Sequence, residues 1–489
     1  MSLKVVAGGS AAAAVADNID KLVADKVASR IAAKDFTLWG KDAEAESSIR
    51  LGWVNSAKDS LPLVEPIVAL RNEFAAKGVT RFVLCGMGGS SLAPEVITRT
   101  AGVELVVLDS THPDQIADAL AGDLSKTAIV VSSKSGSTVE TDSQKRIFEK
   151  AFTDAGIDKA DRVVVVTDPG SPMEAAAKVD GYRVFNADPT VGGRYSALTA
   201  FGLVPSGLAG VDIAGLLAEA NAVADLLASD SAENPALILG AALGATPGEY
   251  GLRDKIGIVS EGSSIIGFGD WAEQLIAEST GKIGKGVLPV VLEQNSTELN
   301  AGLADFLAVK VVAEATATRG DEVAVSGPLG AQFLLWEYAT VIASRLIGIN
   351  PFDQPDVESA KIAARGMLEQ RDEVIAPLFV DGNVEVRATE LAASGDLKAA
   401  INLLLSKLDT DSGYVSVHAY LDRTSVAEAE ELRDLFAIKT RRPVTFGWAP
   451  RFLHSTGQYH KGGPRQGVYL QLVSEAAADI QVPGRDFTF

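Results

Sequence analysis

The sequence predicts an α/β protein built from two doubly wound parallel sheets, with a small α/β region at the C-terminal end. Three observations predict this fold class. Short runs of Val, Ile and Leu alternate with helical segments, polar residues rarely interrupt the runs, and several runs end in glycine-bearing loops. Strands that are apolar on both faces are typical of parallel sheets covered by helices on both sides.

The first 205 residues are expected to form a helical segment and the first sheet. Residues 1–75 are rich in Ala, and their apolar positions recur at three- and four-residue spacing, which predicts helices. Residues 76–205 change to alternating strands and helices and end in a Gly-rich connector. The expected strands of this first domain are RFVLCGMG, VELVVLDS, TAIVVSSKSG, RVVVVTDPG and YRVFNAD.

The rest of the sequence divides into a second β/α domain and a C-terminal region. Residues 206–370 are expected to contain the strands KIGIVSEGS, VLPVVLEQ and LAVKVVAEA, with the helix DWAEQLIAES between the first two. Two further helices are expected over most of 329–348 and from about 355 to 370. Residues 371–489 are expected to place the strands YVSVHAYL, PVTFGWAP and GVYLQLVS around the helix SVAEAEELRDLFAIK.

The charge and the cysteine count exclude several classes of function. The chain has 64 acidic and 44 basic side chains among 489 residues, so its formal net charge is −20. Such a surface repels nucleic-acid backbones and anionic lipid, and we expect neither as a partner. Cys85 is the only cysteine, which excludes a disulfide framework and suits a reducing compartment. We find neither a signal-peptide core nor an apolar stretch long enough to cross a membrane, and we therefore expect a cytoplasmic protein.

Two glycine-bearing loops follow expected strands of the first domain, GMGGSS at 86–91 and SSKSGST at 132–138. In parallel sheets, ligands bind beyond the carboxyl ends of the strands, where small residues and a helix N-terminus favour anions. The first loop alone fits a tight turn with a Ser cap equally well. The second loop has more hydroxyl groups than capping needs, and it favours an anion site; these hydroxyls belong to Ser133, Ser135, Ser137 and Thr138.

An anion bound by so acidic a chain requires basic side chains nearby. The candidates are Arg194, Lys282, Lys285 and Lys361, although each alone could be a surface charge. No metal or other cofactor is expected, because the four histidines show neither HExxH spacing nor a CxxC partner. These histidines are His112, His418, His454 and His460; we expect the first two to be structural or surface residues.

Several motifs resemble those of a known enzyme family. GMGGSSLAPE and SSKSGSTVET resemble the paired sugar-phosphate loops of sugar isomerase (SIS) domains. More specifically, PTVGGRYSALTAFGL at 189–203, WAEQLIAESTGKIGKGVLP at 271–289 and INPFDQPDVESAK at 349–361 resemble the signature regions of the glucose-6-phosphate isomerase family, in that family's order. RFLHSTGQYHKGGP at 451–464 is similar to the isomerase half of transaldolase/glucose-6-phosphate isomerase fusions.

The resemblance implies a role for individual residues. Glu278 in AESTGK would be the base that moves a proton between C2 and C1 of the sugar, and Arg194 in GGRYS would stabilise the enediolate. Lys361 would act at the ring oxygen or near O1. Substrate-binding residues would be Gly89, Ser90, Ser133, Lys134, Ser135, Ser137, Thr138, Gly193, Gln274 and Gln354.

One departure from the family pattern concerns ring opening. Most members of the family carry a ring-opening histidine between the glutamate and lysine motifs, but no histidine lies between Glu278 and Lys361 here. We hypothesise that His454 or His460 replaces it. The alternative is that HSTGQYHKGG is a polar loop that folds the C-terminal region onto the rest of the protein.

These observations lead to an expected activity with two alternatives. The expected function is that of a cofactor-free glucose-6-phosphate isomerase, and the resemblance implies a homodimer. A dual phosphoglucose/phosphomannose isomerase fits the same motifs, because both epimers share the enediolate. A non-catalytic regulator that binds a phosphosugar would need the hydroxyl-rich loop, but not Glu278, Arg194 and Lys361 together.

Overall fold

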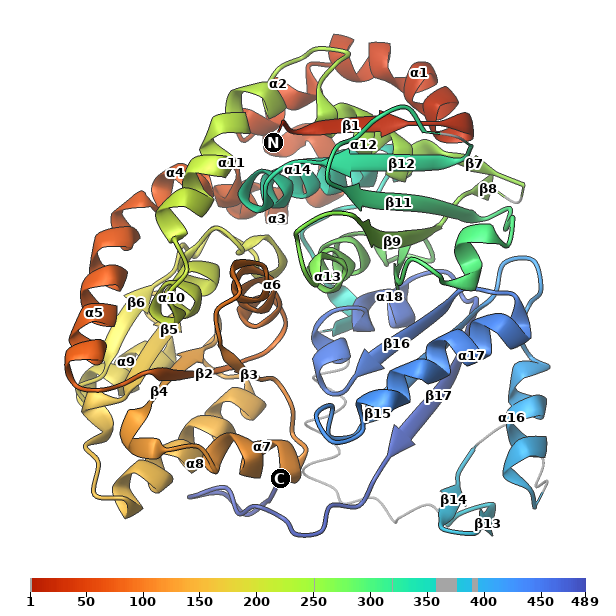
Figure 1. The fold of residues 1–489 in the computed structure, drawn as a ribbon. Coiled ribbons are helices and arrows are strands. Elements are labelled where there is room, and N and C mark those ends of the chain that lie inside the picture. The colour runs from red at the N-terminus through yellow and green to blue at the C-terminus, as the bar shows by residue number, and fades with distance from the viewer. Residues whose placement is uncertain (1, 250, 319, 358–375, 389–394) are drawn as a thin grey trace.

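The computed structural model describes residues 2–249, 251–318, 320–357, 376–388 and 395–489 of the chain. Two five-stranded sheets and a three-stranded sheet make up most of it, each with helices packed against it (Figure 1). The strands of these three sheets are parallel to one another, with one exception. One edge strand of a five-stranded sheet is antiparallel to its neighbour. The predicted fold class is confirmed.

The first sheet is formed by the five strands expected from the sequence. Its order is β3-β2-β4-β5-β6, so the direction of winding reverses between the neighbours β2 and β4. The strands are β2 (Arg81–Gly86), β3 (Val106–Leu108), β4 (Thr127–Ser132), β5 (Val163–Thr167) and β6 (Arg183–Asn186). The helices around it are α5 (Val64–Ala76), α6 (Leu92–Ala101), α7 (Pro113–Leu120), α8 (Val139–Asp154), α9 (Pro172–Val179) and α10 (Ala200–Ala209).

The second sheet contains two strands that the sequence analysis missed. Its order is β1-β12-β11-β9-β10, and β1 is the antiparallel edge strand. The strands are β1 (Lys4–Ala7), β9 (Lys255–Glu261), β10 (Leu288–Leu292), β11 (Phe306–Val312) and β12 (Glu322–Ser326). The expectation that residues 1–75 are wholly helical is therefore wrong at the start, because the run KVVA pairs with β12.

Long apolar helices cover the second sheet and join it to the N-terminal segment. The N-terminal helices are α1 (Gly9–Ala24), α2 (Val27–Ala32), α3 (Glu44–Arg50) and α4 (Ser56–Asp59). Helices α11 (Ile213–Leu227), α12 (Pro235–Ala245), α13 (Phe268–Thr280) and α14 (Leu329–Ile347) follow, with a short hairpin of β7 (Pro247–Gly248) and β8 (Gly251–Leu252). Most of the helix expected at about 355–370 lies outside the described residues, as does Lys361.

The C-terminal region forms a sheet of order β16-β15-β17, as its three apolar runs predict. Its elements are the hairpin β13 (Phe379–Asp381) and β14 (Val384–Val386), α16 (Leu397–Leu405), β15 (Tyr414–Tyr420), α17 (Glu431–Thr440), β16 (Val444–Trp448), α18 (Gly457–Gly462) and β17 (Gly467–Val473). In Figure 1 this region lies beside α13, with α18 below and to the right of that helix.

The C-terminal region contacts both sheet domains. Its last segment crosses to the first domain, where Val482 is fully buried in the apolar core and Arg485 pairs with Asp142 at 2.7 Å. Its helix α18 packs on the end of α13, where a Cβ added at Gly281 would lie 2.3 Å from the Cα of Tyr459. The region is therefore part of the same packed structure and not a detached appendage.

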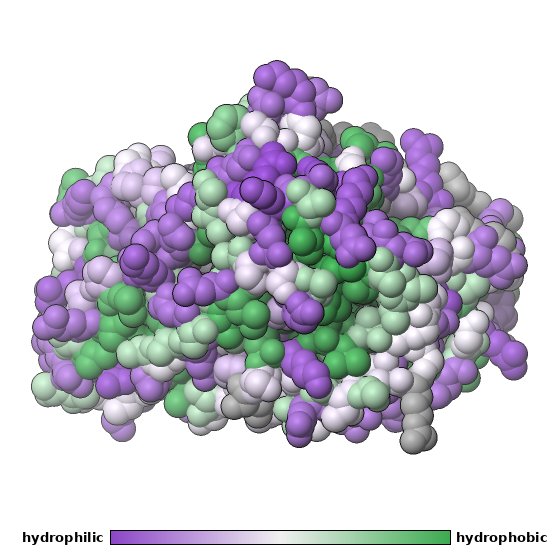
Figure 2. Space-filling view, turned by 90° about the horizontal axis from the view of Figure 1, so that it is seen from above, coloured by the Kyte–Doolittle hydropathy of each residue, from purple (hydrophilic) through white to green (hydrophobic). Residues whose placement is uncertain are grey.

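The outer surface carries many charged and polar side chains. Figure 2 views the molecule from the side on which β1 and α1 lie, and hydrophilic residues cover much of that face, with separate hydrophobic areas between them. Within the described residues, the structure contains no helix that combines the length and apolar character needed to cross a membrane.

Candidate active site

The centre of the candidate site is a contact between Arg194 and Glu278. Glu278 lies in the last turn of α13, and Arg194 lies in a 3₁₀ turn, Gly193–Tyr195, that follows the first sheet. The Nη1 atom of Arg194 is 3.1 Å from Oε1 of Glu278. The Arg194 residue is 4% exposed and Glu278 is 9% exposed, so both partners of this contact are buried.

The remaining donors of Arg194 hold the guanidinium in one orientation. Its Nε donates to the hydroxyl of Ser279 at 2.8 Å, and its Nη2 donates to the carbonyl oxygens of Pro351 at 2.6 Å and Asp353 at 3.3 Å. Ser279 also exchanges a hydrogen bond with Tyr195 at 2.9 Å. A planar guanidinium fixed at several atoms presents its charge in a single direction, which suits it to stabilising an oxyanion.

Gln274 lies one helical turn before Glu278 and shares its face of α13, as the spacing predicts. Its Nε2 donates to Oε2 of Glu278 at 3.1 Å and to the carbonyl oxygen of His454 at 2.7 Å. Gln274 therefore links the expected base to the C-terminal region. The carboxylate of Glu278 is held from both sides, by Arg194 on one oxygen and by Gln274 on the other.

The hydroxyl-rich loop lies at the carboxyl end of β4 and leads into α8. Ser133 and Thr138 lie 3.0 Å apart at their hydroxyl oxygens, and Ser135 and Ser137 are also 3.0 Å apart. Thr138 is the N-cap residue of α8, but its side chain makes no capping hydrogen bond. The first N–H groups of α8 therefore have no cap from Thr138, and this arrangement suits a bound anion.

Two glycines allow the loops of the first domain to pack closely. Gly136 adopts a φ of +67°, and a Cβ there would lie 2.8 Å from the Cβ of Met173. A Cβ at Gly89 would lie 2.0 Å from the carbonyl oxygen of Gly193, so the loop after β2 touches the turn that carries Arg194. By contrast, a Cβ at Gly193 would meet no atom within 4 Å. The space beside the Cα of Gly193, where a side chain would begin, is therefore open.

Ser90 lies in the same loop as Gly89 and is 8% exposed. Because β2 and β4 are neighbours, with Gly86 opposite Ser132, the loops that contain Ser90 and Ser133 begin side by side. The structure therefore brings the two expected phosphate loops together at the point where the winding of the first sheet reverses, as the rule for parallel sheets predicts.

Lys134 is already paired in the structure. Its Nζ lies 2.6 Å from Oδ2 of Asp168. Burial lowers the pKa of Lys134 and raises the pKa of Asp168, although the ion pair opposes both shifts. Burial thus disfavours the charged forms of both Lys134 and Asp168. An anion bound close to Lys134 would favour the positively charged form of the lysine.

Lys282, one of the basic candidates, has a different role from the expected one. Its Nζ donates to the carbonyl oxygen of Asn350 at 2.8 Å and to two oxygens of Asp353, at 2.5 and 2.7 Å. Burial, followed by the nearby charge of Arg194, lowers its pKa to about 8. Lys282 therefore fixes the 350–353 segment that Arg194 also binds. Lys285 donates to the carbonyl oxygen of Ile347.

The two candidate histidines lie in different surroundings. His454 ends a 3₁₀ turn, Arg451–His454; its Nε2 is 3.3 Å from Oε1 of Glu140 in the first turn of α8. The ring of His460 instead contacts the hydroxyls of Tyr414 at 2.9 Å and Ser416 at 3.5 Å, within the C-terminal sheet. Burial lowers the pKa of His460 well below the ordinary value, so this ring is held neutral.

Gln354 lies at the exposed edge of the site. Its Oε1 is 3.5 Å from Nη1 of Arg194, which is the same nitrogen that contacts Glu278. The structure thus brings Gln354 to the expected group of residues. Lys361, the last residue of the same motif, lies outside the described residues.

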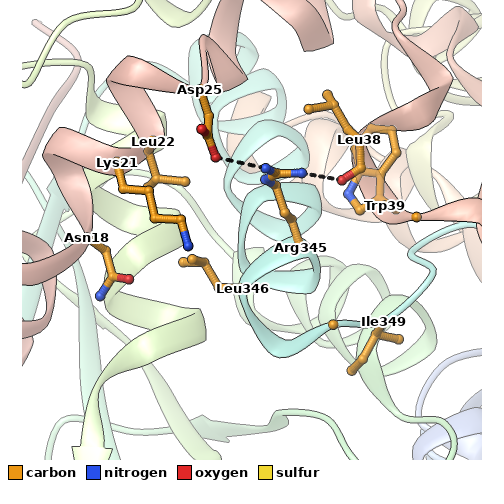
Figure 3. Close-up of a pocket in the computed structure, with 11 residues that line it drawn as sticks. Asn18, Lys21, Leu22, Asp25, Leu38, Trp39, Arg345, Leu346 and Ile349 are labelled. Carbon is orange, nitrogen blue, oxygen red and sulfur yellow. Dashed lines mark hydrogen bonds and ion pairs between the residues drawn. The ribbon is translucent and has the colours of Figure 1, made fainter.

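A separate cavity lies at the C-terminal end of α14. It has a volume of about 310 Å³ and lies between α1, the turn at residues 36–40 and the end of α14 (Figure 3). Arg345 crosses it, pairing with Asp25 and donating to the carbonyl oxygen of Leu38 (Figure 3). None of the expected site residues lines this cavity, so it is distinct from the candidate site.

The arrangement provides a carboxylate in contact with a fixed guanidinium, a hydroxyl-rich loop suited to an anion, and the ring of His454. Among the described residues there is no group of three or more side chains that could hold a metal ion. Such a site can move a proton on a phosphorylated substrate and stabilise the oxyanion that forms.

Comparisons with known proteins agree with this description. Residues 64–300 match the model of a family described as phosphoglucose isomerase. A glucose-6-phosphate isomerase of Synechococcus elongatus is 30% identical over 356 residues, which are 60% of this chain and 67% of that protein. A probable glucose-6-phosphate isomerase of Natronomonas pharaonis is 32% identical over 61% of this chain and 81% of that protein. This chain belongs to the glucose-6-phosphate isomerase family.

Membership of the glucose-6-phosphate isomerase family confirms the recognition made from the motifs, and with it the expected class of aldose–ketose isomerases. The match with the Haloarcula marismortui relative, a probable glucose-6-phosphate isomerase, is 37% identical but spans 48% of that protein and 42% of this chain.

Two solved structures share the fold. A hypothetical protein of Thermus thermophilus, TT0462, superposes with a TM-score of 0.64 over 75% of this chain and 100% of its own length, at 24% identity. A glucose-6-phosphate isomerase of Chlamydia trachomatis superposes with a TM-score of 0.55 over 68% of this chain and 75% of its own length, at 20% identity.

Several residues that shape the site were not predicted from the sequence. Asp353 binds Lys282, Ser279 binds Arg194, and Tyr195 binds Ser279. None of Asp353, Ser279 and Tyr195 was among the predicted site residues. All three lie inside the quoted motifs, beside residues that were singled out. Their position in those motifs is the signal that could have found them.

Proposed function

We propose that the protein interconverts glucose 6-phosphate and fructose 6-phosphate, with Glu278 as the base. The observation that carries this proposal is the contact of Arg194 with Glu278, next to loops suited to a phosphate. A regulator that only binds a phosphosugar needs the loops, but it has no use for a buried carboxylate held between a guanidinium and an amide.

The central step is a proton transfer between two neighbouring carbons. Glu278 takes the proton from C2 of the open-chain aldose and returns it to C1, while the hydroxyl proton of O2 passes to O1, which leaves the ketose. The negative charge that develops on the sugar oxygens in between is stabilised by Arg194, whose remaining donors keep it in place. The hydrogen bond from Gln274 keeps the carboxylate of Glu278 in a fixed orientation.

The phosphate is held by the two loops of the first domain. Hydroxyls of Ser90, Ser133, Ser135, Ser137 and Thr138 and the N–H groups at the start of α8 donate to it, with Lys134 nearby. This anchor lies in the first domain, whereas Glu278 lies on α13 of the second. The substrate therefore bridges the two domains, and the anchored phosphate places the sugar against the base.

Ring opening needs an acid, and His454 is the better of the two candidates. Its carbonyl oxygen binds Gln274, the neighbour of Glu278, and its ring reaches the start of α8. The ring of His460 is occupied by Tyr414 and Ser416. By resemblance to the family, Lys361 assists at the ring oxygen or near O1, and Gln354 binds sugar hydroxyls or the phosphate.

We also propose that the enzyme needs no cofactor and that it works as a homodimer in the cytoplasm. The resemblance to the family supports the dimer, and the lone buried Cys85 suits a reducing compartment. Light scattering after gel filtration measures the mass in solution, and a monomer would contradict the dimer. Activity that survives a chelator supports the cofactor-free mechanism, whereas its loss would contradict it.

The test is an assay of the purified protein with glucose 6-phosphate, together with its Glu278→Gln variant. We expect the wild type to form fructose 6-phosphate and the variant to lose at least about a thousandfold in kcat. The exposed Glu314 provides a control, since Glu314→Gln should leave kcat unchanged. An inactive wild type would overturn the proposal, and an active Glu278→Gln variant would overturn the choice of base. Conversion of mannose 6-phosphate would identify the dual activity.

A further inference from the structure

The side-chain amide of Gln458 is buried and forms hydrogen bonds to two separate segments of the candidate site. It lies in α18 of the C-terminal region and is fully buried. Its Nε2 donates to the carbonyl oxygen of Gly281 at 2.9 Å and to Oδ2 of Asp356 at 2.6 Å. Its Oε1 accepts from the backbone N–H groups of Asp356 and Val357, both at 3.2 Å. All four hydrogen-bonding positions of the amide are therefore used.

The two segments that Gln458 joins both determine the geometry at the reacting centre. Gly281 follows the last residue of α13, which carries Glu278 in its last turn. Asp356 follows the short segment whose carbonyl oxygens at Pro351 and Asp353 receive hydrogen bonds from Arg194. Gln458 thus connects the end of the helix that carries the base to the loop that holds the guanidinium.

The packing around Gln458 leaves little freedom for this connection to vary. The N–H of Gly284 donates to the carbonyl oxygen of Gly462 at 2.8 Å. A Cβ added at Gly462 would lie 2.2 Å from Oδ2 of Asp356 and 2.8 Å from the carbonyl oxygen of Gly281. Backbone atoms of α18 therefore touch the same two segments that the amide binds.

We propose that Gln458 is a positioning residue for the isomerase reaction, which sets the distance between Glu278 and Arg194 by holding Gly281 and Asp356 together. It acts through these segments and not on the substrate. This inference rests on the proposed function and deepens it, because it gives the C-terminal region a role in the reaction that does not depend on either histidine.

The expected effect falls on kcat and not on KM. The phosphate loops lie in the first domain, and Gln458 contacts neither of them, so substrate binding should change little. A displacement of the base or the guanidinium by about 1 Å costs up to about a hundredfold in rate. We therefore expect Gln458→Leu, which keeps the volume but removes all four hydrogen bonds, to lower kcat by about 10- to 100-fold with KM within about twofold of wild type.

A second variant tests the hydrogen-bonding pattern itself. In Gln458→Glu, one carboxylate oxygen can still accept from the N–H groups of Asp356 and Val357, but the other faces the oxygens of Gly281 and Asp356. Protonation of the new carboxyl group restores a donor, and the neighbouring oxygens favour that proton. We expect kcat of Gln458→Glu relative to wild type to rise at least about fivefold between pH 8 and pH 6. A purely structural residue would not produce this dependence on pH.

The matched control is Gln144→Leu. Gln144 is as fully buried as Gln458 and donates to the carbonyl oxygen of Ser110 at 2.9 Å in the first domain. Its variant loses a buried amide hydrogen bond without touching Gly281 or Asp356, and kcat should stay within about twofold of wild type. An equal loss in both Leu variants, or an unchanged kcat in a folded Gln458→Leu variant, would overturn the proposal.

Hydrogen–deuterium exchange separates this inference from the proposed function. In Gln458→Leu, the amides of Asp356 and Val357 lose their acceptor, and we expect them to exchange at least about tenfold faster than in wild type. If wild type does not isomerise glucose 6-phosphate, the proposed function fails, and exchange still tests whether Gln458 holds the segment. Unchanged exchange at both amides would overturn the positioning role whatever the activity.

Discussion

Arg194 Nη1 lies 3.1 Å from Glu278 Oε1, although the two residues belong to different sheet domains. Two sets of contacts maintain this pair. Ser279, Pro351 and Asp353 hold the guanidinium, and Gln274 holds the second oxygen of the carboxylate. The proposed base and the guanidinium proposed to stabilise the oxyanion are thus held in place in the absence of substrate, which would remove the cost of arranging them during the reaction.

Replacing Arg194 by Lys tests this fixed orientation. A lysine keeps the positive charge but cannot contact Ser279, Pro351 and Glu278 together, so we expect kcat to fall about 100- to 1000-fold. Steady-state kinetics at several substrate concentrations measure the change. The matched control is Arg345→Lys, which alters another ion-paired arginine, bound to Asp25, away from the site. A loss in Arg194→Lys no larger than in the control would contradict the role of Arg194.

The two histidines can be distinguished by separate alanine substitutions. We expect His454→Ala to lower the rate about 10- to 100-fold with the cyclic sugar phosphate, because general acid catalysis of ring opening is lost. An open-chain substrate should restore most of that loss. His460→Ala should behave alike with both forms of substrate, since its ring is bonded within the C-terminal sheet. Full activity of His454→Ala on the cyclic substrate would exclude it as the acid.

Removing hydroxyls from the loop before α8 tests the phosphate site. In the double variant Ser133→Ala and Thr138→Ala, the phosphate loses two donors, and we expect KM to rise about 10- to 100-fold while kcat changes little. Ser48, an exposed hydroxyl in α3, provides the control through Ser48→Ala. Titration with inorganic phosphate should show the same weakening as KM. An unchanged KM would place the phosphate elsewhere.

Glu273 gives a prediction about stability and pH. Burial and the nearby charge of Asp270 raise its pKa to about 8 from 4.5, so the folded protein keeps a proton that the unfolded chain loses. Stability should therefore fall as pH rises from about 4.5 to about 8. Gln stays neutral, so we expect Glu273→Gln to be as stable as wild type near pH 4.5 and more stable at pH 8, by on the order of 3 kcal/mol.

Thermal unfolding of wild type and Glu273→Gln at pH 4.5, 6 and 8 measures this difference. Glu314→Gln serves again as the control, because an exposed carboxylate should give no dependence of the difference on pH. Parallel curves for wild type and Glu273→Gln across this range would show that the carboxyl of Glu273 is ionised at neutral pH in the folded protein.

Most of the fold could be predicted because most strands lie in runs of apolar residues. The five strands of the first sheet and three of the second satisfy that condition. Strand β12 was missed although it is as long as β5, and β1 has only four residues and precedes an Ala-rich helix. The pairing of β1 with β12 depends on tertiary packing, which a local pattern does not encode.

The candidate site, like the fold, could be predicted from the sequence only in part. Glu278, Arg194 and the hydroxyl loop lie in motifs, and the structure brings them together. The roles of Lys282 and Gln458 depend on bonds to backbone oxygens far away in the sequence, 71 residues from Lys282 to Asp353 and 177 from Gln458 to Gly281. Every residue has a backbone carbonyl oxygen, so the residue type does not show which one accepts a hydrogen bond. Sequence motifs therefore cannot reveal these contacts.

Strand β1 also constrains the order in which the chain can fold during synthesis. Its partner β12 is synthesised only after about 300 more residues, so β1 stays unpaired on the nascent chain until then. The strands of the first sheet all lie between β1 and β12 in the sequence, and that domain can fold while β1 waits. Pairing over so long a separation is slow. We expect translation pauses before residue 326 to expose an apolar edge that binds chaperones.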